Sequence, residues 1–578
     1  MSPSKSINVE LFHGETVSHL IESVFFCAKW QTLFDSCVWA TSMQGVHFVK
    51  PWYKIYKDVY EPLIIKGFDE EKNLVGLLCL AIDRATKEIV IAGAQQCEYQ
   101  TWLAANEYGD LFIERAMRIL SEIYPTKSLS FVALAQGSPL SWASKDKNWG
   151  KQTHLRDIAL PLLRIGDGSY VEQSLQTPRN RSGISQMKRY GNIEFVQLHK
   201  AEELEAVFDE IKLYGDLRLS AFHRVHPSSD PLKKSFYLQL MKAELLHVTL
   251  LKIDGRIASA HVNLHNRNQI LMGMVTLSPF FAKFSPGKFH IFFLCQELLK
   301  QGILTLDLTP GGHYKDRFTN DIENGHALTV FFNRPNYFRF KTKRRIIEST
   351  KTILEKINID HKALNLIRTS FSDKAKFFTL GKATKALFSR IKRKLHDKRE
   401  MRIYIYDVHK IPPLPGQNLM NRNSLEDLIK YEQFESYQPT ISQFHHEALK
   451  RIEKGRIIYT RVENDVLVHY GWLVEREEKS FVSEVEQELT LLSNSAVLYD
   501  FYSHPSARGK GLFQASLSQM LRDAVEIPYT AQIYISVLAD NKPSRHVIEK
   551  VGFDYHLSLW LNKTLGMLRS YKSEQADK

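Results

Sequence analysis

The stretch Tyr-Asp-Phe-Tyr-Ser-His-Pro-Ser-Ala-Arg-Gly-Lys-Gly-Leu-Phe at residues 499–513 decides the fold of this chain. A strand is expected to end near Ser503, and a helix is expected to begin near Gly509. Backbone N–H groups at a helix N-terminus have no intrahelical partners and, with the helix dipole, form an anion site. The turn contains two cations and two glycines that let the backbone approach a phosphate: Arg508, Gly509, Lys510 and Gly511. The stretch predicts a phosphate-binding turn, with an ordinary strand-to-helix turn as the alternative.

A second motif lies downstream, after a strand expected over residues 532–537. It reads Asp-Asn-Lys-Pro-Ser-Arg-His-Val-Ile-Glu-Lys-Val-Gly-Phe at residues 540–553. Asn541 can cap a helix, Ser544 is small on its first turn, and Gly552 can end it. The two motifs together predict one α/β domain over residues 401–578.

This pair of motifs resembles the GNAT acyltransferase superfamily over about residues 400–565. The acyl-CoA pyrophosphate loop of that family reads Arg/Gln-x-x-Gly-x-Gly/Ala, and its later signature is Asn-x-x-Ala/Ser with a Gly-Phe exit. Here the last loop position is Phe513 instead of Gly or Ala. The resemblance implies that two parallel strands, 496–503 and 532–537, splay apart around the pantetheine arm. It also implies that acyl-CoA, with acetyl-CoA as the expected donor, binds at Arg508, Gly509, Lys510, Gly511 and Asn541.

The same resemblance implies that an acceptor amine or hydroxyl attacks the thioester directly, with a carboxylate or a water chain as base and often a Tyr as acid. The usual Tyr position falls on Ile548. Tyr555 is a candidate substitute, as are Tyr499, Tyr502 and Tyr534, unless the thiolate leaves without help. Asp500 is the candidate base, with His504 and Glu475 behind it. The structural alternatives are that Asp500 faces solvent and that His504 only shapes the turn.

Residues 166–340 carry a second set of motifs. Ser-Pro-Phe-Phe-Ala-Lys-Phe-Ser-Pro-Gly-Lys at residues 278–288 precedes an expected helix, and Leu-Thr-Leu-Asp-Leu-Thr-Pro-Gly-Gly-His-Tyr-Lys-Asp-Arg-Phe spans 304–318. Over about residues 20–320 the chain resembles CelD-type acetyltransferases, which are linked to bacterial cellulose and exopolysaccharide production and are related to Fem-type aminoacyltransferases. In that group two GNAT-like units lie side by side, and the first often lacks a complete cofactor site.

Candidate site residues follow for this second unit. Ser285, Gly287 and Lys288 could hold a pyrophosphate at the helix start, and Asp307 at a strand end could act as base. Tyr314, with Lys315 and Arg317, could bind an anionic or polyhydroxylated group. The structural alternatives are that Asp307 caps a turn and that Tyr314 is packed core.

Residues 1–165 form the third expected unit and contain no phosphate loop. Several of their residues fit the N-terminal half of the CelD-type group: Trp30, Leu33, Phe48, Trp52, Tyr53, Pro62, Gly93 and Glu98-Tyr99-Gln100. The expected fold class is α/β with mixed (α+β) sheets, in three GNAT-like units over 1–165, 166–340 and 401–578. Each unit repeats helices, a hairpin and a strand–helix–strand segment.

The charge of the chain is concentrated in one segment. Its 578 residues carry a net charge of +13, and residues 341–400 hold 18 Lys/Arg against 6 Asp/Glu. Apolar residues at helical spacing predict a basic helical connector there. Such a connector is either a solvated linker or a peripheral contact for anionic membrane lipid. Nucleic acid is not expected, because neither an RNA-binding aromatic signature nor zinc-finger spacing is present.

Other classes are excluded by composition and motif. The five cysteines form no CxxC pair. Neither a signal peptide nor a membrane-spanning stretch is recognised. These features predict a cytoplasmic protein. No metal site is expected, since His261, His265 and His313 lack a ligand-like set. The expected activity is acyl-CoA-dependent acyl transfer, of GNAT N-acetyltransferase type, to an amine or hydroxyl of a sugar, exopolysaccharide or cell-envelope precursor. The alternatives are a Fem-like aminoacyl-tRNA-dependent transferase and a non-catalytic GNAT-fold scaffold.

Overall fold

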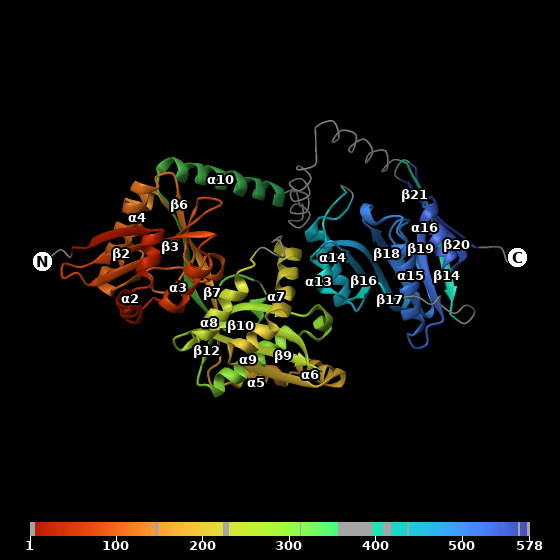
Figure 1. The fold of residues 1–578 in the computed structure, drawn as a ribbon, viewed down its shortest axis with the longest axis horizontal. Coiled ribbons are helices and arrows are strands. Elements are labelled where there is room, and N and C mark those ends of the chain that lie inside the picture. Colours follow the sequence, from red (N-terminus) through yellow and green to blue (C-terminus); the bar gives the residue numbers. More distant parts are fainter. Residues whose placement is uncertain are drawn as a thin grey trace. The chain divides into compact units, whose positions relative to one another are not determined.

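The computed structural model describes residues 6–144, 148–223, 230–312, 314–356, 396–408, 418–435, 438–564 and 567–574. The chain divides into two compact units (Figure 1): unit 1 holds residues 1–215 and 228–359, and unit 2 holds 216–227 and 360–578. Helix α10 (Arg334–Lys356) covers the start of the expected basic connector. The rest of that connector up to residue 395 lies outside the described residues, so its membrane contact stays a prediction.

Unit 1 begins with a five-stranded sheet whose paired strands are all antiparallel. The strands are β1 (Asn8–His13), β2 (Tyr60–Phe68), β3 (Leu74–Asp83), β4 (Ile89–Ile91) and β5 (Leu103–Ala104). Helices of this part include α2 (Val24–Ser36), α3 (Val46–Ile55) and α4 (Gly109–Ile123). Helix α4 lies so close to the sheet that a Cβ at Gly76 would come within 2.3 Å of the Phe112 ring. A glycine on β3 therefore makes room for the aromatic core of this part.

The second sheet of unit 1 has eight strands in the order β6-β13-β7-β12-β11-β10-β9-β8. They are β6 (Ser128–Leu134), β7 (Thr153–Arg164), β8 (Ile193–Leu198), β9 (Leu246–Ile253), β10 (Arg256–Asn266), β11 (Gln269–Leu277), β12 (Thr305–Asp307) and β13 (Asp321–Phe331). Helix α9 (Pro286–Lys300) packs on the sheet through a buried apolar face that includes Phe289 and Leu294. Strands β6 and β7 precede the expected boundary at residue 165, yet they pair within this sheet.

Unit 2 is built on an eight-stranded sheet in the order β15-β16-β17-β18-β19-β14-β20-β21. The strands are β14 (His396–Asp407), β15 (Asn421–Arg422), β16 (Ile457–Glu463), β17 (Val466–Val482), β18 (Gln487–Ser503), β19 (Gln532–Leu538), β20 (Asp554–Thr564) and β21 (Met567–Glu574). Helices α15 (Leu512–Val525) and α16 (Lys542–Lys550) supply buried residues to a core that also includes Ile533 and Ile535 of β19. The mixed α/β class expected from the sequence is confirmed.

The two eight-stranded sheets share a topology. Each sheet has one parallel pair, β11–β12 or β18–β19, and the strand beside the second member of that pair comes from earlier in the chain. That inserted strand is β7 in unit 1 and β14 in unit 2, and each lies antiparallel between its neighbours. Of the three copies predicted from the sequence, two share this strand order, whereas the five-stranded sheet at the start of unit 1 has antiparallel pairs only.

Two hairpin turns consist of residue types that adopt positive φ readily. Asp254 and Gly255 join β9 to β10 with φ of 53° and 72°, and Asn464 and Asp465 join β16 to β17 with φ of 49° and 64°. Positive φ at both central residues matches the right-handed twist of the flanking strands, which explains the preference for Asn, Asp and Gly.

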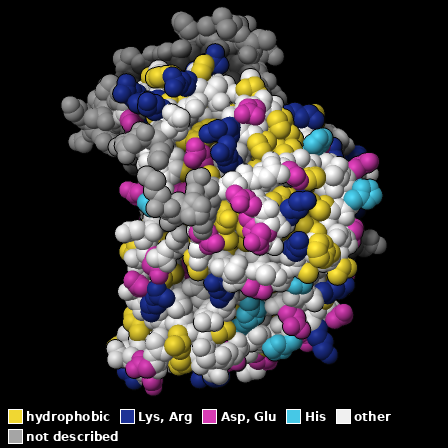
Figure 2. All heavy atoms as spheres, turned by 90° about the vertical axis from the view of Figure 1, so that its left-hand side faces the viewer, with side chains coloured by type: hydrophobic (Ala, Val, Ile, Leu, Met, Phe, Trp, Pro, Cys, Tyr) yellow, Lys and Arg dark blue, Asp and Glu magenta, His cyan; other side chains and the backbone are white. Residues whose placement is uncertain are grey.

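The described surface carries both signs of charge. Figure 2 shows one face, on which acidic and basic side chains are interspersed with hydrophobic ones. Within the described part of the chain, no helix is both long enough and apolar enough to cross a membrane.

Candidate functional site

The parallel strands of unit 1 separate at Asp307. Strand β12 pairs with β11 at Leu306 and Asp307, opposite Ile270 and Leu271, and then ends. Strand β11 continues to Leu277 paired with β10, across a register shift between Val262 and Leu264. A short pairing followed by divergence leaves the Asp307 carboxylate at the point where the two strands part.

The Asp307 carboxylate is buried, with 4% of the residue exposed. The hydroxyl of Tyr99 donates to Oδ2 over 2.9 Å, and the Thr309 N–H donates to Oδ1 over 2.7 Å. Burial raises the pKa of Asp307 to about 6, and the hydrogen bonds from Thr309 and Tyr99 and the charge of Lys315 oppose that rise. Asp307 thus caps a turn, as the structural alternative held, and is also a carboxylate suited to accept a proton near neutral pH.

Lys315 and Tyr314 are consecutive residues that differ in exposure. The buried Lys315 ammonium donates to the Thr309 carbonyl and hydroxyl over 3.1 and 3.0 Å. Burial lowers the pKa of Lys315, and the charges of Glu98 and Asp307 oppose this. Tyr314 is 43% exposed, and its hydroxyl lies 3.9 Å from the Met272 sulfur of β11. Tyr314 is therefore a partly accessible ring beside the diverging strands and not a core residue.

Three further residues of this site were not assigned from the sequence. Tyr99 comes from the segment before α4 and lies 208 positions from Asp307. Glu98 precedes it, and burial raises the pKa of Glu98 while the charges of Lys315 and Lys233 oppose the rise. Glu98-Tyr99-Gln100 was recognised as part of a family pattern, but its distance along the chain hid its pairing with Asp307. Lys233, at the start of α8 (Lys233–Lys242), had no sequence signal.

The start of α9 gathers positive charge. Ser285, with φ of 54°, ends the turn before α9, and the Lys288 ammonium donates to the Asn180 side chain. Burial lowers the pKa of Lys288, and the nearby charges of Arg179 and Arg317 lower it further. Three mutually repelling cations beside a helix N-terminus fit a diphosphate, which would neutralise them.

Gly287 has a packing role at this helix start. A Cβ at Gly287 would come within 2.6 Å of the Leu277 side chain, so glycine lets α9 lie close to the end of β11. The charge of Arg317, which was grouped with Tyr314 and Lys315 from the sequence, acts on Lys288.

The parallel strands of unit 2 diverge as predicted. Strands β18 and β19 pair only through Ala496–Leu498 and Ile533–Ile535, and β18 then continues to Ser503 against β17. The β17–β18 register shifts between Tyr470 and Trp472, opposite Asp500, which has φ of 49°. This irregularity bends β18 where it leaves β19.

Asp500 forms an ion pair. Its carboxylate accepts from the Arg451 guanidinium, which also lies 5.0 Å from the Trp472 ring and 5.2 Å from the Tyr499 ring. Glu475, the reserve base, lies 3.9 Å from Arg422. The ring nitrogen of His504 accepts from the Ser506 N–H over 3.2 Å, so His504 shapes the turn. The proposed base of unit 2 is thus held by a cation, in contrast to Asp307.

The glycine-rich turn of unit 2 has the backbone that an anion requires. Gly509 and Gly511 have φ of 77° and 75°, with open space beside each Cα, and α15 begins directly after them. Arg508 donates to Glu435 over 3.0 Å, and the Lys510 ammonium lies 3.9 Å from Glu463. The main chain is open to a diphosphate, whereas both cations already contact carboxylates. Phe513 does not fill the turn, because its ring packs against Phe501 at 5.1 Å.

The remaining predicted residues of unit 2 lie around α16. Asn541 accepts from the Ser544 N–H over 3.2 Å and caps that helix. Ile548 is buried in the core, so an acid is absent from the usual Tyr position. The Tyr555 hydroxyl pairs with Ser558 over 3.0 Å, and that of Tyr534 donates to Gln532 over 2.7 Å. Among the described residues no group of three or more His, Cys, Asp or Glu side chains could hold a metal ion, and His313 lies outside them.

Family models match part of each eight-stranded region. Models described as acetyltransferase (GNAT) domains match residues 179–316 and residues 423–554. A search of curated proteins found no match. Each matched range contains one of the two diverging parallel pairs, β11–β12 or β18–β19.

Solved structures similar to the chain include three with related descriptions. The C-terminal domain of a putative lysylphosphatidylglycerol synthetase from Agrobacterium fabrum is 11% identical, with 55% of this chain and 94% of that chain covered and a TM-score of 0.37. FemX is 10% identical over 54% and 98%, with a TM-score of 0.37. A tandem GNAT protein from the clavulanic acid biosynthesis pathway is 13% identical over 67% and 100%, with a TM-score of 0.20.

Proposed function

We propose that this chain, which carries two GNAT acetyltransferase domains, transfers an acyl group from acyl-CoA at the Asp307 site of unit 1. The expected donor is acetyl-CoA, and the expected acceptor is an amine or hydroxyl on a sugar or cell-envelope precursor. The observation that carries the proposal is the buried Asp307 carboxylate at the divergence of β11 and β12, with a pKa of about 6.

The chemistry follows from the surroundings of that carboxylate. Asp307 takes the proton of the acceptor N–H or O–H as the acceptor lone pair attacks the thioester carbonyl. The C–S bond then breaks, and the thiolate leaves and takes a proton from solvent. A base is most effective when its pKa lies near the working pH, and the pKa of Asp307 meets that condition.

Three further features of unit 1 support this assignment. The Tyr99 hydroxyl holds the carboxylate in one orientation through its 2.9 Å hydrogen bond. The cluster of Lys288, Arg179 and Arg317 at the start of α9 supplies positive charge for the diphosphate of the donor. The partly exposed Tyr314 ring and the charges of Glu98 and Lys233 offer contacts to a polar acceptor.

A thiol-release assay with acetyl-CoA and a panel of amine and glycan acceptors tests the proposal. We expect Asp307→Asn to lower kcat by about 100-fold or more, the usual contribution of a general base. The matched variant Asp500→Asn, in which the removed carboxylate is already ion-paired, should keep kcat within about threefold of wild type. An Asp307→Asn enzyme with full activity would refute the assignment, and loss of wild-type activity on RNase treatment would favour aminoacyl-tRNA as donor.

A further inference from the structure

A cavity of about 480 Å³ lies in unit 2 where the sheet loses a strand. Strand β14 pairs with β20 from His396 to Ile405, but with β19 only from Met401 onward. After Leu538 the chain turns away into α16, and the Ala539 N–H makes a last bond to the Glu400 carbonyl over 2.9 Å. The first residues of β14 therefore border an opening on one edge. A cavity of this size is typical of small-molecule sites.

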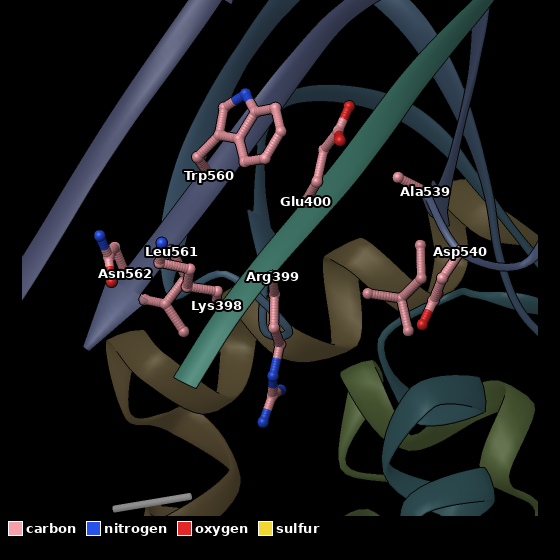
Figure 3. A pocket seen from close by; sticks show the side chains of 9 residues that line it. Lys398, Arg399, Glu400, Ala539, Asp540, Trp560, Leu561 and Asn562 are labelled. Carbon is pink, nitrogen blue, oxygen red and sulfur yellow. The ribbon is translucent and has the colours of Figure 1, made fainter. Parts of the chain in front are cut away.

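One face of this opening carries a set of polar and aromatic side chains. Glu400 lies opposite Trp560, and Lys398 lies opposite Asn562, in the β14–β20 register. Residues two apart on a strand share a face, so these four side chains emerge together. Figure 3 shows the Trp560 ring and the Glu400 carboxylate on the same side of β14, with Arg399 on the other.

The Glu400 carboxylate is held in place. Ser558 donates to it over 2.7 Å, Arg402 donates to it over 3.3 Å, and 19% of its side chain is exposed. Arg399 is directed elsewhere, because its guanidinium donates to the Glu484 carbonyl over 3.2 Å. A fixed carboxylate beside an aromatic ring gives a ligand a defined direction of approach.

The lining of the cavity determines the class of ligand. Because the Arg399 guanidinium is directed at the Glu484 carbonyl, the cations to count are Lys398 and Arg402, the partner of Glu400. These two balance the carboxylates Glu400 and Asp540, so a charged ligand gains no net attraction. Donors and acceptors are both present, which suits a ligand rich in hydroxyl groups. The indole of Trp560 supplies a flat apolar surface for the C–H face of a ring. We propose that this cavity binds a neutral saccharide ring, stacked on Trp560 and hydrogen-bonded to Glu400 and Asn562.

Saccharide binding to the full chain, in the absence of acyl-CoA, tests this proposal. Glucose and N-acetylglucosamine are the neutral probes, glucosamine and glucose 6-phosphate are the charged comparators, and calorimetry with saturation-transfer NMR is the readout. We expect the neutral sugars to bind at least threefold more tightly than either charged sugar. Trp560→Ala should weaken binding at least tenfold, Trp560→Phe should keep it within about threefold, and Glu400→Gln should weaken it about fivefold.

Two control variants show whether sugar binding depends on this cavity. Tyr529→Ala removes an exposed aromatic ring from the same unit, and it should leave saccharide affinity unchanged. Phe481→Ala, which removes another exposed ring of unit 2, should also leave it unchanged; no acyl-CoA is present, so failure of the proposed transfer reaction would not affect the result. Absence of neutral-sugar binding, wild-type affinity in Trp560→Ala, preference for a charged sugar, or displacement of the sugar by adenosine 3′,5′-bisphosphate would overturn the proposal.

Discussion

In each GNAT domain a carboxylate lies where the two parallel strands diverge, but the groups around it differ. Asp307 lies at the end of the shorter strand of its parallel pair, buried and bonded to neutral donors. Asp500 lies on the longer strand of its pair, at an irregularity, and contacts the Arg451 guanidinium. Burial raises the pKa of Asp307 to about 6, whereas the Asp500 carboxylate is already engaged by the Arg451 guanidinium. The diverging strands provide a location, and the neighbouring groups decide whether the carboxylate there can act as a base.

The cofactor turns differ in the opposite sense. In unit 2 the glycine-bearing turn offers open main chain, but its cations contact Glu435 and Glu463. In unit 1 the turn before α9 lacks that glycine pair, yet Lys288 is surrounded by further cations. Unit 2 thus offers the more open main chain, and unit 1 the more cationic surroundings, to the diphosphate of the proposed donor. This comparison leads to three measurable differences.

The largest expected difference is in acid stability. In unit 1 the rings of His261 and His290 stack at 4.0 Å, and both side chains are fully buried. Burial lowers the pKa of His261 to about 3 and that of His247 to about 4, and it places the pKa of His290 well below its usual value. The other titratable groups that act on this cluster are His265 and Glu297.

The sign of the effect follows from linkage. The unfolded chain takes up these protons below about pH 6.5, but the folded chain does not until the pH approaches 3 to 4. Stability from the neutral imidazoles is present above pH 6.5 and is lost as the pH falls. At pH 4.5 each such histidine lowers the free energy of unfolding by about 2 to 3 kcal/mol. We therefore expect unit 1 to unfold at a higher pH than unit 2, which contains the comparable His469.

Hydrogen exchange read by mass spectrometry checks this order, because peptides report each unit separately. His261→Gln should reduce the acid sensitivity of unit 1, whereas His13→Gln, at an exposed position, should not. Simultaneous unfolding of both units at one pH, unaltered by His261→Gln, would contradict the prediction.

The second difference concerns the hydrogen bond from Tyr99 to Asp307. This bond favours the charged carboxylate, so Tyr99→Phe should raise the pKa of Asp307 above about 6. The acidic limb of the pH–rate profile should move to higher pH, and kcat/KM near neutrality should fall about tenfold. Tyr499→Phe in unit 2 is the matched control and should leave the limb in place. A uniform loss of rate without a shift of the limb would mean that Tyr99 only supports the fold.

Much of the fold was predictable because it depends on local patterns. The Asp-Gly and Asn-Asp turns, the glycine pair before α15 and the Asn541 cap are all encoded within a few residues. The divergence of β18 and β19 followed from a family resemblance carried by those same residues.

The site in unit 1 was only half predictable. Asp307 could be placed at a strand end, but Tyr99 reaches it from 208 positions away, and nothing in the local sequence encodes that contact. Likewise, the ion pairs of Asp500 with Arg451 and of Arg508 with Glu435 join separate elements. Residue type identified the candidates, whereas protonation and pairing depend on tertiary contacts that single-sequence patterns do not contain.

The smallest expected difference concerns the Glu435–Arg508 pair in unit 2. A diphosphate at the glycine turn must compete with the Glu435 carboxylate, which lies 3.0 Å from the guanidinium. Because a partly exposed ion pair contributes up to about 1 kcal/mol, Glu435→Gln should tighten CoA binding to unit 2 by about threefold to fivefold. The gain in CoA affinity should shrink as salt is added, because screening weakens the attraction of Arg508 both to Glu435 and to the diphosphate.

Calorimetry with CoA measures this change. The Gly511→Glu variant should have the opposite effect and weaken CoA binding to unit 2. A side chain at φ of 75° is strained, and a carboxylate there repels the diphosphate, so the binding event assigned to unit 2 should disappear. Lys288→Glu should remove the event of unit 1 in the same way. If Glu435→Gln and Gly511→Glu both leave the titration unaltered while Lys288→Glu abolishes it, the glycine turn of unit 2 takes no part in CoA binding, and the donor site of the chain is the cationic start of α9.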